Sequence, residues 1–272
     1  MDIFIQQLSA TSRMPLIDSV TMSAAGQPII IKPSLPIELL PTDLARLFTL
    51  AHPAILLAAY TIRFPSLVSD PVPTLLSSLL PLAIIQASYA VICLPATGTT
   101  VKLIKKPKPG AKKTESPSWS PVVSMSKSSE HTSTDKTKQT IFYALLLSLF
   151  SVAVLAAIQV LFGAPVTTHI PHTILSSSHL ALLAVFPLVY VHGSDSKKWK
   201  EVISAYSPID EVFGATVGCF LGAWLGAIPI PLDWDREWQK WPVTIVTGAY
   251  AGYVVGKLVG GFLLKGKRIE LD

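Results

Sequence analysis

Residues 231–242, with the sequence PLDWDREWQKWP, carry the side chains in this 272-residue chain whose types and spacing come closest to a chemical site. Asp233 and Asp235 form an Asp-x-Asp pair, and carboxylates at this spacing can hold a divalent cation. Arg236 and Lys240 beside them offer ordinary salt bridges instead. An enzyme also needs a nucleophile next to a general base, a second acidic cluster or a phosphate-binding loop, and the loops of this sequence contain none of these. We therefore predict no catalytic residue.

Four histidines form a second candidate, at His169, His172, His179 and His192. A helical zinc site needs histidines four residues apart with a carboxylate in reach. The nearest pairs here are three and seven residues apart, and no acidic residue lies between them. We therefore predict no metal site and no cofactor, and we favour pore-facing or interfacial positions for these histidines. The two cysteines are expected to be packing residues without a disulfide.

The elements that must position these side chains are membrane helices. Half of the residues are hydrophobic and only 14% are charged, and the apolar residues occur in long runs that a soluble domain would not show. A helix needs about 20 apolar residues to cross about 30 Å of hydrocarbon. Six segments meet this requirement: 44–63, 72–94, 141–163, 172–192, 212–230 and 242–264. The sequence thus predicts an all-α integral membrane protein with six transmembrane helices.

These segments divide the chain into five regions. The region before the first span is punctuated by prolines, and the one between the second and third spans is rich in Lys, Ser, Thr and Pro, which is typical of a flexible loop. The predicted regions are a cytosolic N-terminal arm (1–43), transmembrane helices 1–2 (44–94), a flexible basic cytosolic loop (95–139), transmembrane helices 3–6 (140–264) and a cytosolic tail (265–272).

The distribution of basic residues predicts the orientation, because Lys and Arg next to spans stay on the cytosolic side. A run of lysines from Lys102 to Lys138 and the basic residues near both termini would share one side of the membrane. The other side would hold only Arg63, Arg236 and Lys240. We therefore expect cytosolic termini and a lumenal 231–242 segment. The basic loop suits anionic lipid headgroups, and no nucleic-acid partner is predicted.

The last two predicted spans share an internal repeat, a glycine at every fourth position. The eight stripe glycines are Gly214, Gly218, Gly222 and Gly226 in the fifth span and Gly248, Gly252, Gly256 and Gly260 in the sixth. A step of four residues advances 400° around a helix, so each stripe drifts by only about 40° and forms a groove without side chains. In lipid such grooves let helices approach closely. They either join the two spans into a glycine-striped hairpin or receive a lipid or a helix of another protein.

Two further expectations concern residues beside these stripes. If residues 234–241 form a short interfacial helix, Trp234, Trp238 and Trp241 share one face and the charged side chains point to the lumen. Lys257 lies near the cytosolic end of the last span, so its side chain can reach the interface and need not be a buried charge.

Residues 207–256 resemble the C-terminal signature of the PIG-F family of glycosylphosphatidylinositol (GPI) anchor assembly. The shared elements are the glycine-spaced fifth span, Gly222-Ala223-Trp224, Pro231-Leu232-Asp233-Trp234-Asp235-Arg236, Trp238-Gln239 and Trp241-Pro242. The resemblance implies a noncatalytic subunit in the endoplasmic reticulum membrane. Its partners would be the catalytic subunits of the ethanolamine-phosphate transferases that modify the second and third mannoses of the GPI precursor, together with membrane lipids.

The partner or lipid interface would then consist of the eight stripe glycines with Asp233, Trp234, Asp235, Arg236, Trp238 and Trp241. Two other classes of function stay open. One is a membrane enzyme or lipid carrier that presents phosphatidylethanolamine or GPI lipid to the transferase, for which Asp233 and Asp235 would be essential. The other is a channel or transporter, which the scarcity of acidic residues in the spans disfavours.

Overall fold

The computed structural model describes residues 20–22, 28–30, 34–98, 127–232 and 234–268. The chain divides into two units, Met1–Leu35 and Pro36–Asp272. The first contains the short strands β1 (Val20–Met22) and β2 (Pro28–Ile30), which pair antiparallel. The second unit contains all the helices of the described residues.

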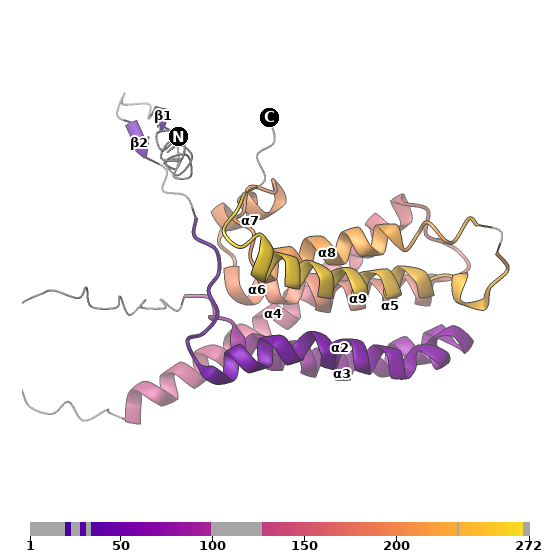
Figure 1. Cartoon of the computed structure of the whole chain (residues 1–272), viewed down its shortest axis with the longest axis horizontal. Coiled ribbons are helices and arrows are strands. Elements are labelled where there is room, and N and C mark those ends of the chain that lie inside the picture. Colours follow the sequence, from indigo (N-terminus) through magenta and orange to yellow (C-terminus); the bar gives the residue numbers. More distant parts are fainter. Residues whose placement is uncertain (1–19, 23–27, 31–33, 99–126, 233, 269–272) are drawn as a thin grey trace, which may run out of the picture. The chain divides into compact units, whose positions relative to one another are not determined.

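The long helices of the second unit pack side by side in a bundle, in which α5 and α6 continue each other as one helix (Figure 1). The helices of this unit are α2 (Asp43–Ser69), α3 (Pro71–Cys93), α4 (Lys127–Leu161), α5 (Ile170–Leu180), α6 (Phe186–His192), α7 (Ser196–Ile203), α8 (Glu211–Leu225) and α9 (Val243–Leu258). A π-helical turn, Ala181–Val185, joins α5 to α6, and another, Val259–Leu263, extends α9. The Thr42 hydroxyl caps α2 by accepting from the Ala45 N–H, and Pro71 occupies the first turn of α3.

Within the described residues, five helices are long and apolar enough to cross a membrane, so the prediction of an all-α membrane protein is confirmed. They are Asp43–Ser69, Pro71–Cys93, Asp135–Leu161, Ile170–His192 and Val243–Leu263. The count of six is not confirmed, because α8 has 15 residues and its length of about 22 Å falls short of the hydrocarbon thickness. The chain continues beyond α8 in turns as far as Pro231.

The helix α4 starts earlier than the sequence analysis predicted. It begins at Lys127, so the predicted loop 95–139 is helical from that residue onward, while residues 99–126 lie outside the described part. Once a helix is nucleated by its apolar portion, each further residue adds one backbone hydrogen bond. Lys138 and Asp135 support this polar extension with an ion pair one turn apart, at 3.9 Å.

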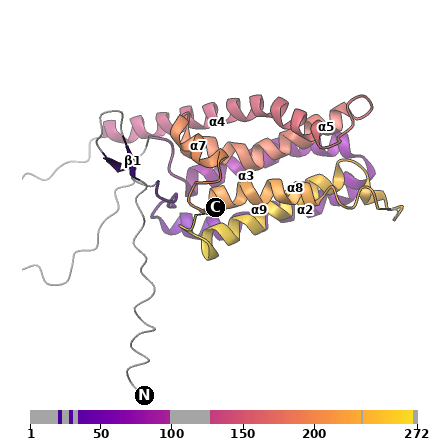
Figure 2. The same cartoon turned by 90° about the horizontal axis from the view of Figure 1, so that it is seen from above.

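The segment Ile170–His192 forms the centre of the bundle, and α4 lies at its edge. In the most apolar stretch of each helix, 78% of the residues are buried in Ile170–His192 and 17% in α4. Figure 2 shows α4 along the outer side, with α5 between it and the α8–α9 pair. The exposed apolar side chains of α4, such as Leu149 and Phe150, are consistent with a face toward lipid. Both cysteines are buried and free, as the sequence predicted.

Asp210 fixes the beginning of α8 in this bundle. Its Oδ1 accepts hydrogen bonds from the Val212 and Phe213 backbone N–H groups, each at 2.9 Å. Its Oδ2 accepts from the Ile37 N–H at 3.0 Å, so the same carboxyl joins the segment before α2 to α8. Burial raises the pKa of Asp210, and these backbone donors act against the rise.

Candidate functional site

The stripe glycines of α8 and α9 face each other along a continuous seam. A Cβ added to any of the eight would lie less than 3.0 Å from a backbone atom of the facing segment. Gly222 meets Gly248 and Gly252, and Gly218 meets Gly252 and Gly256. The two backbones are therefore in direct contact, as expected for glycine-mediated packing in lipid. The structure thus places these glycines together in an intramolecular hairpin, the first of the two arrangements expected from the sequence.

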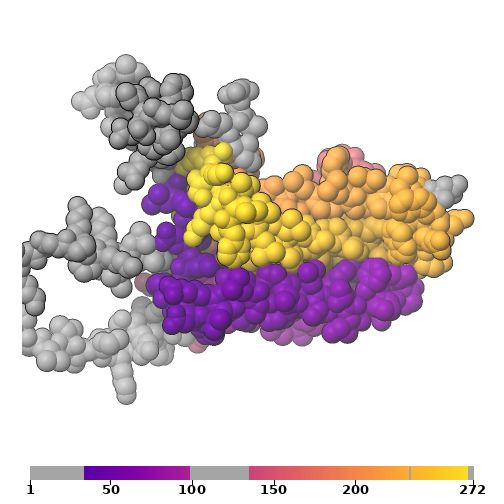
Figure 3. Space-filling model, viewed as in Figure 1, coloured from indigo at the N-terminus to yellow at the C-terminus, as the bar shows by residue number. Residues whose placement is uncertain are grey.

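The outer side of the same seam is an open apolar groove. It measures about 770 Å³ and runs the length of the hairpin. The glycines form its floor, and the rim residues include Val217, Leu221 and Leu225 of α8, Ala251 and Val255 of α9, and Val259 of the π-helical turn after α9. Figure 3 shows α8 and α9 side by side, with α2 next to them. The hairpin therefore uses the inner side of its glycine stripes and leaves their outer side free within the described residues.

Residues 231–242 connect α8 to α9 without forming the predicted interfacial helix. Of its described residues, only Glu237–Gln239 is helical, as a single 3₁₀ turn. Asp235 has a φ of 50°, which lies in the left-handed region and prevents a helix from starting at Trp234. The prediction that three tryptophans share one helical face is therefore wrong. The Trp234 and Trp238 rings nevertheless lie 5.9 Å apart, and Trp241 is partly buried.

Gln239, which the sequence analysis named only as part of the shared family signature, holds this connection in place. Its side-chain amide donates to the carbonyls of Pro229 and Leu232 at 2.8 and 2.9 Å. Its Oε1 accepts from the Arg236 N–H at 2.9 Å. These bonds satisfy backbone groups that have no helical partner. Gln239 is buried, and this role depends on the three-dimensional course of the loop, which no local motif signals.

The charged residues of this segment are mostly exposed. Asp235 and Arg236 are exposed, and Lys240 pairs with Glu237 at 3.2 Å. Asp233 lies outside the described residues, so the predicted Asp-x-Asp pair has no described geometry. In the described part of the chain, no three His, Cys, Asp or Glu side chains are placed to hold a metal ion.

A buried polar cluster on four helices is the main feature that sequence reasoning missed. Lys257 is only 2% exposed, with its Nζ 3.8 Å from Glu211 Oε2 and 3.5 Å from the centre of the Tyr89 ring. The same Glu211 oxygen accepts hydrogen bonds from the Thr49 and Tyr89 hydroxyls at 2.7 and 2.9 Å. His52 stacks on Tyr89. The expectation that Lys257 extends to the interface is therefore wrong.

His179 belongs to a second buried contact between helices. The Leu75 carbonyl, 3.1 Å from Nε2, can only accept, so Nε2 carries the proton. The other ring nitrogen, Nδ1, therefore accepts from the Tyr250 hydroxyl at 2.9 Å. Of the four histidines, His179 and His192 are buried and His169 is exposed. The expected pore-facing or interfacial position is thus wrong for His179, which links α3, α5 and α9.

These features define a multi-pass α-helical membrane protein with a glycine-sealed C-terminal hairpin. The family model described as "PIG-F: GPI biosynthesis protein family Pig-F" matches residues 51–261, which include this hairpin. The chain therefore belongs to the Pig-F family, and the resemblance seen in residues 207–256 is confirmed.

Individual relatives agree with this assignment. The chain is 46% identical over 237 residues to glycosylphosphatidylinositol anchor biosynthesis protein 11 of Neurospora crassa, covering 86% of this chain and 80% of that protein. Identity to the protein of the same name in Aspergillus fumigatus is 40% over 261 residues, covering 87% and 86%. The human "GPI ethanolamine phosphate transferase, stabilizing subunit" is 36% identical over 131 residues, covering 46% and 58%. No solved structure matches the chain.

Proposed function

We propose that this chain is a noncatalytic subunit that binds and stabilises ethanolamine-phosphate transferases of GPI-anchor assembly in the endoplasmic reticulum membrane. The observation that carries the proposal is the family match over residues 51–261, together with the stabilizing-subunit name of the human and mouse relatives. The partners are the catalytic subunits that modify the second and third mannoses. The phosphoethanolamine transfer itself takes place on those subunits.

The outer groove of the α8–α9 hairpin is the proposed contact with the catalytic subunit. A groove of about 770 Å³ with a glycine floor and an aliphatic rim matches the shape of a transmembrane helix. In lipid, where water is not expelled, association depends on close packing, and a surface without side chains permits the closest approach of two backbones. The eight stripe glycines thus seal the hairpin on one side and offer its other side to the partner.

The 231–242 segment extends this contact to the lumenal side in our proposal, with both termini in the cytosol. The beginning of α2 and the end of α9 lie at the same end of the bundle, and the α8–α9 connection lies at the opposite end (Figure 1). This arrangement supports an even number of membrane passes. Trp234, with 53% of its surface exposed, and the charges of Asp235 and Arg236 would then face the catalytic domain of the partner.

The expected result in cells that lack this chain is a several-fold fall in the amount of catalytic subunit, since an unpartnered membrane protein is removed by quality control. Quantitative immunoblotting of membranes measures it, and a pull-down from detergent extracts should recover the catalytic subunit with the wild-type chain. Equal transferase abundance and activity with and without this chain would overturn the proposal.

The variant Asp235→Asn distinguishes a noncatalytic subunit from an enzyme that uses Asp235, because asparagine also tolerates the left-handed backbone. In cells that lack the wild-type chain, this variant should restore full transferase activity. If the chain were an enzyme that used Asp235 in catalysis, the variant would lose turnover.

A further inference from the structure

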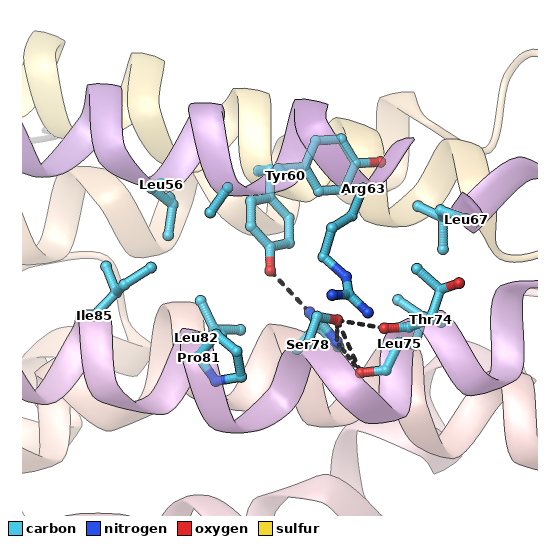
Figure 4. Close-up of a pocket in the computed structure, with 13 residues that line it drawn as sticks. Leu56, Tyr60, Arg63, Leu67, Thr74, Leu75, Ser78, Pro81, Leu82 and Ile85 are labelled. Carbon is cyan, nitrogen blue, oxygen red and sulfur yellow. Dashed lines mark hydrogen bonds between the residues drawn. The ribbon is translucent and has the colours of Figure 1, made fainter. Parts of the chain in front are cut away.

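Arg63 is a cation on the membrane-spanning helix α2 that has no carboxylate partner among the described residues. It is exposed, and its guanidinium donates a hydrogen bond to the Ser77 hydroxyl of α3. Among the described residues, no acidic side chain forms an ion pair with it. Figure 4 shows Arg63 extending from α2 across the space between the two helices toward Ser78. A bound anion beside this charge would be favourable, because an unpaired ion near hydrocarbon is costly.

The position of Arg63 along α2 lets its guanidinium reach the lipid headgroups. The helix has 27 residues, so it is about 40 Å long and exceeds the hydrocarbon thickness by about 10 Å. Arg63 lies six residues before the end of the helix at Ser69, which corresponds to about 9 Å. A guanidinium on its flexible stem can reach the phosphate layer from there. Phosphate is also the anion whose oxygens its planar donors match best.

A cleft between α2 and α3 continues from Arg63 toward the middle of the membrane. It is lined on α2 from Leu67 to Leu56 and on α3 from Thr74 to Ile85, a distance of about 16 Å along α2. The space between the atoms is about 460 Å³, including open space at the mouth. A shallow cleft of this length suits an extended hydrocarbon chain that lies along it.

Apart from Arg63, the groups bordering the cleft are neutral. His179 and Tyr250 satisfy each other, and Ser78 donates to the carbonyls of Thr74 and Leu75 at 2.8 and 2.9 Å. Most of the remaining lining is aliphatic, as at Leu56, Leu82 and Ile85. The cleft therefore combines one fixed positive charge at headgroup depth with an apolar path below it. An anion carrying an acyl chain has this same combination.

We propose that the α2–α3 cleft binds a glycerophospholipid from the membrane leaflet on the side of the short connection between α2 and α3. Its phosphodiester pairs with Arg63 beside Ser77, and one acyl chain lies along Leu56, Leu82 and Ile85. The site is distinct from the α8–α9 groove. The inference does not rest on the proposed function, because it follows from the charge and the cleft alone.

The test uses the full chain in nanodiscs with two photoreactive probes, a phosphatidylcholine and a diacylglycerol that carry the same diazirine-labelled acyl chain. Labelled residues are mapped by peptide mass spectrometry. The phosphatidylcholine probe should label residues 56–85 several-fold more strongly than the diacylglycerol probe. Arg63→Gln should remove this preference, and Arg63→Lys should retain part of it. Equal labelling by both probes in the wild-type chain would overturn the proposal, as would labelling that Arg63→Gln leaves unchanged.

Two controls keep the result interpretable. Arg46→Gln removes an exposed arginine at the other end of α2 that already pairs with Asp43 at 3.3 Å, and it should leave the labelling of the cleft unchanged. Labelling of the exposed face of α4 should be equal in all variants and reports that each variant meets the probes in the nanodisc to the same extent. If Arg63→Gln does not fold, the comparison of the two probes in the wild-type chain still decides.

Discussion

Replacing Gly222 by leucine is expected to separate α8 from α9 and to destabilise the protein by about 3 kcal/mol or more. Even a Cβ at this position would overlap backbone atoms of Gly248 and Gly252, and backbone atoms cannot rotate away as a flexible side chain can. The melting temperature in detergent should fall by on the order of 10 °C. Fluorescence-detected size-exclusion chromatography of heated samples measures this change. Gly222→Ala should also lower the melting temperature, by a smaller amount.

The matched control for this substitution is Ala251→Leu, next to the stripe on α9. Ala251 is exposed and lies on the rim of the outer groove, so added methyl groups there do not enter the seam. Its melting temperature should stay near that of the wild type. A Gly222→Leu variant as stable as Ala251→Leu would show that the two backbones are not in contact.

Lys257→Met is expected to destabilise the protein by about 3–5 kcal/mol, the usual cost of removing one partner from a buried ion pair. Glu211, whose side chain is only 12% exposed, would keep the hydrogen bonds from Thr49 and Tyr89 but lose its cation. Methionine preserves most of the volume of lysine, so the effect reports charge and not a cavity. Thermal unfolding in detergent measures the loss.

The double variant Lys257→Met, Glu211→Gln distinguishes pairing from packing. With neither charge left, no uncompensated carboxylate remains, and a large part of the stability should return. The two single changes should therefore be strongly non-additive. Additive losses would mean that Glu211 and Lys257 act independently and that the buried cluster is not an ion-pair network.

The membrane helices and the hairpin could be predicted from the sequence because their signals are periodic and local. Apolar runs located the spans to within a few residues for α3 and α9. The glycine spacing indicated a close helix pair, since a stripe every fourth residue stays on one face of a helix. The length of α8 was overestimated, because apolar residues continue into the turns that follow Leu225.

The remaining features depend on contacts between distant parts of the chain. Lys257 looked able to reach the interface because its partners lie on three other helices, at Glu211, Tyr89 and His52, and no spacing rule connects them. The 231–242 segment looked helical because its tryptophans have helical spacing. Its course is decided instead by the hydrogen bonds of Gln239 to Pro229 and Leu232.

The most direct test of the stabilising-subunit account is site-specific photo-cross-linking in native membranes. A photoreactive amino acid at position 251 lies on the rim of the α8–α9 groove. One at position 154 lies on the exposed face of α4, outside the groove lining, where the side chain of Val154 has 61% of its surface exposed. We predict a cross-link from position 251 to a transmembrane segment of the transferase catalytic subunit and none from position 154. Cross-links to the catalytic subunit from position 154 but not from position 251 would contradict the account.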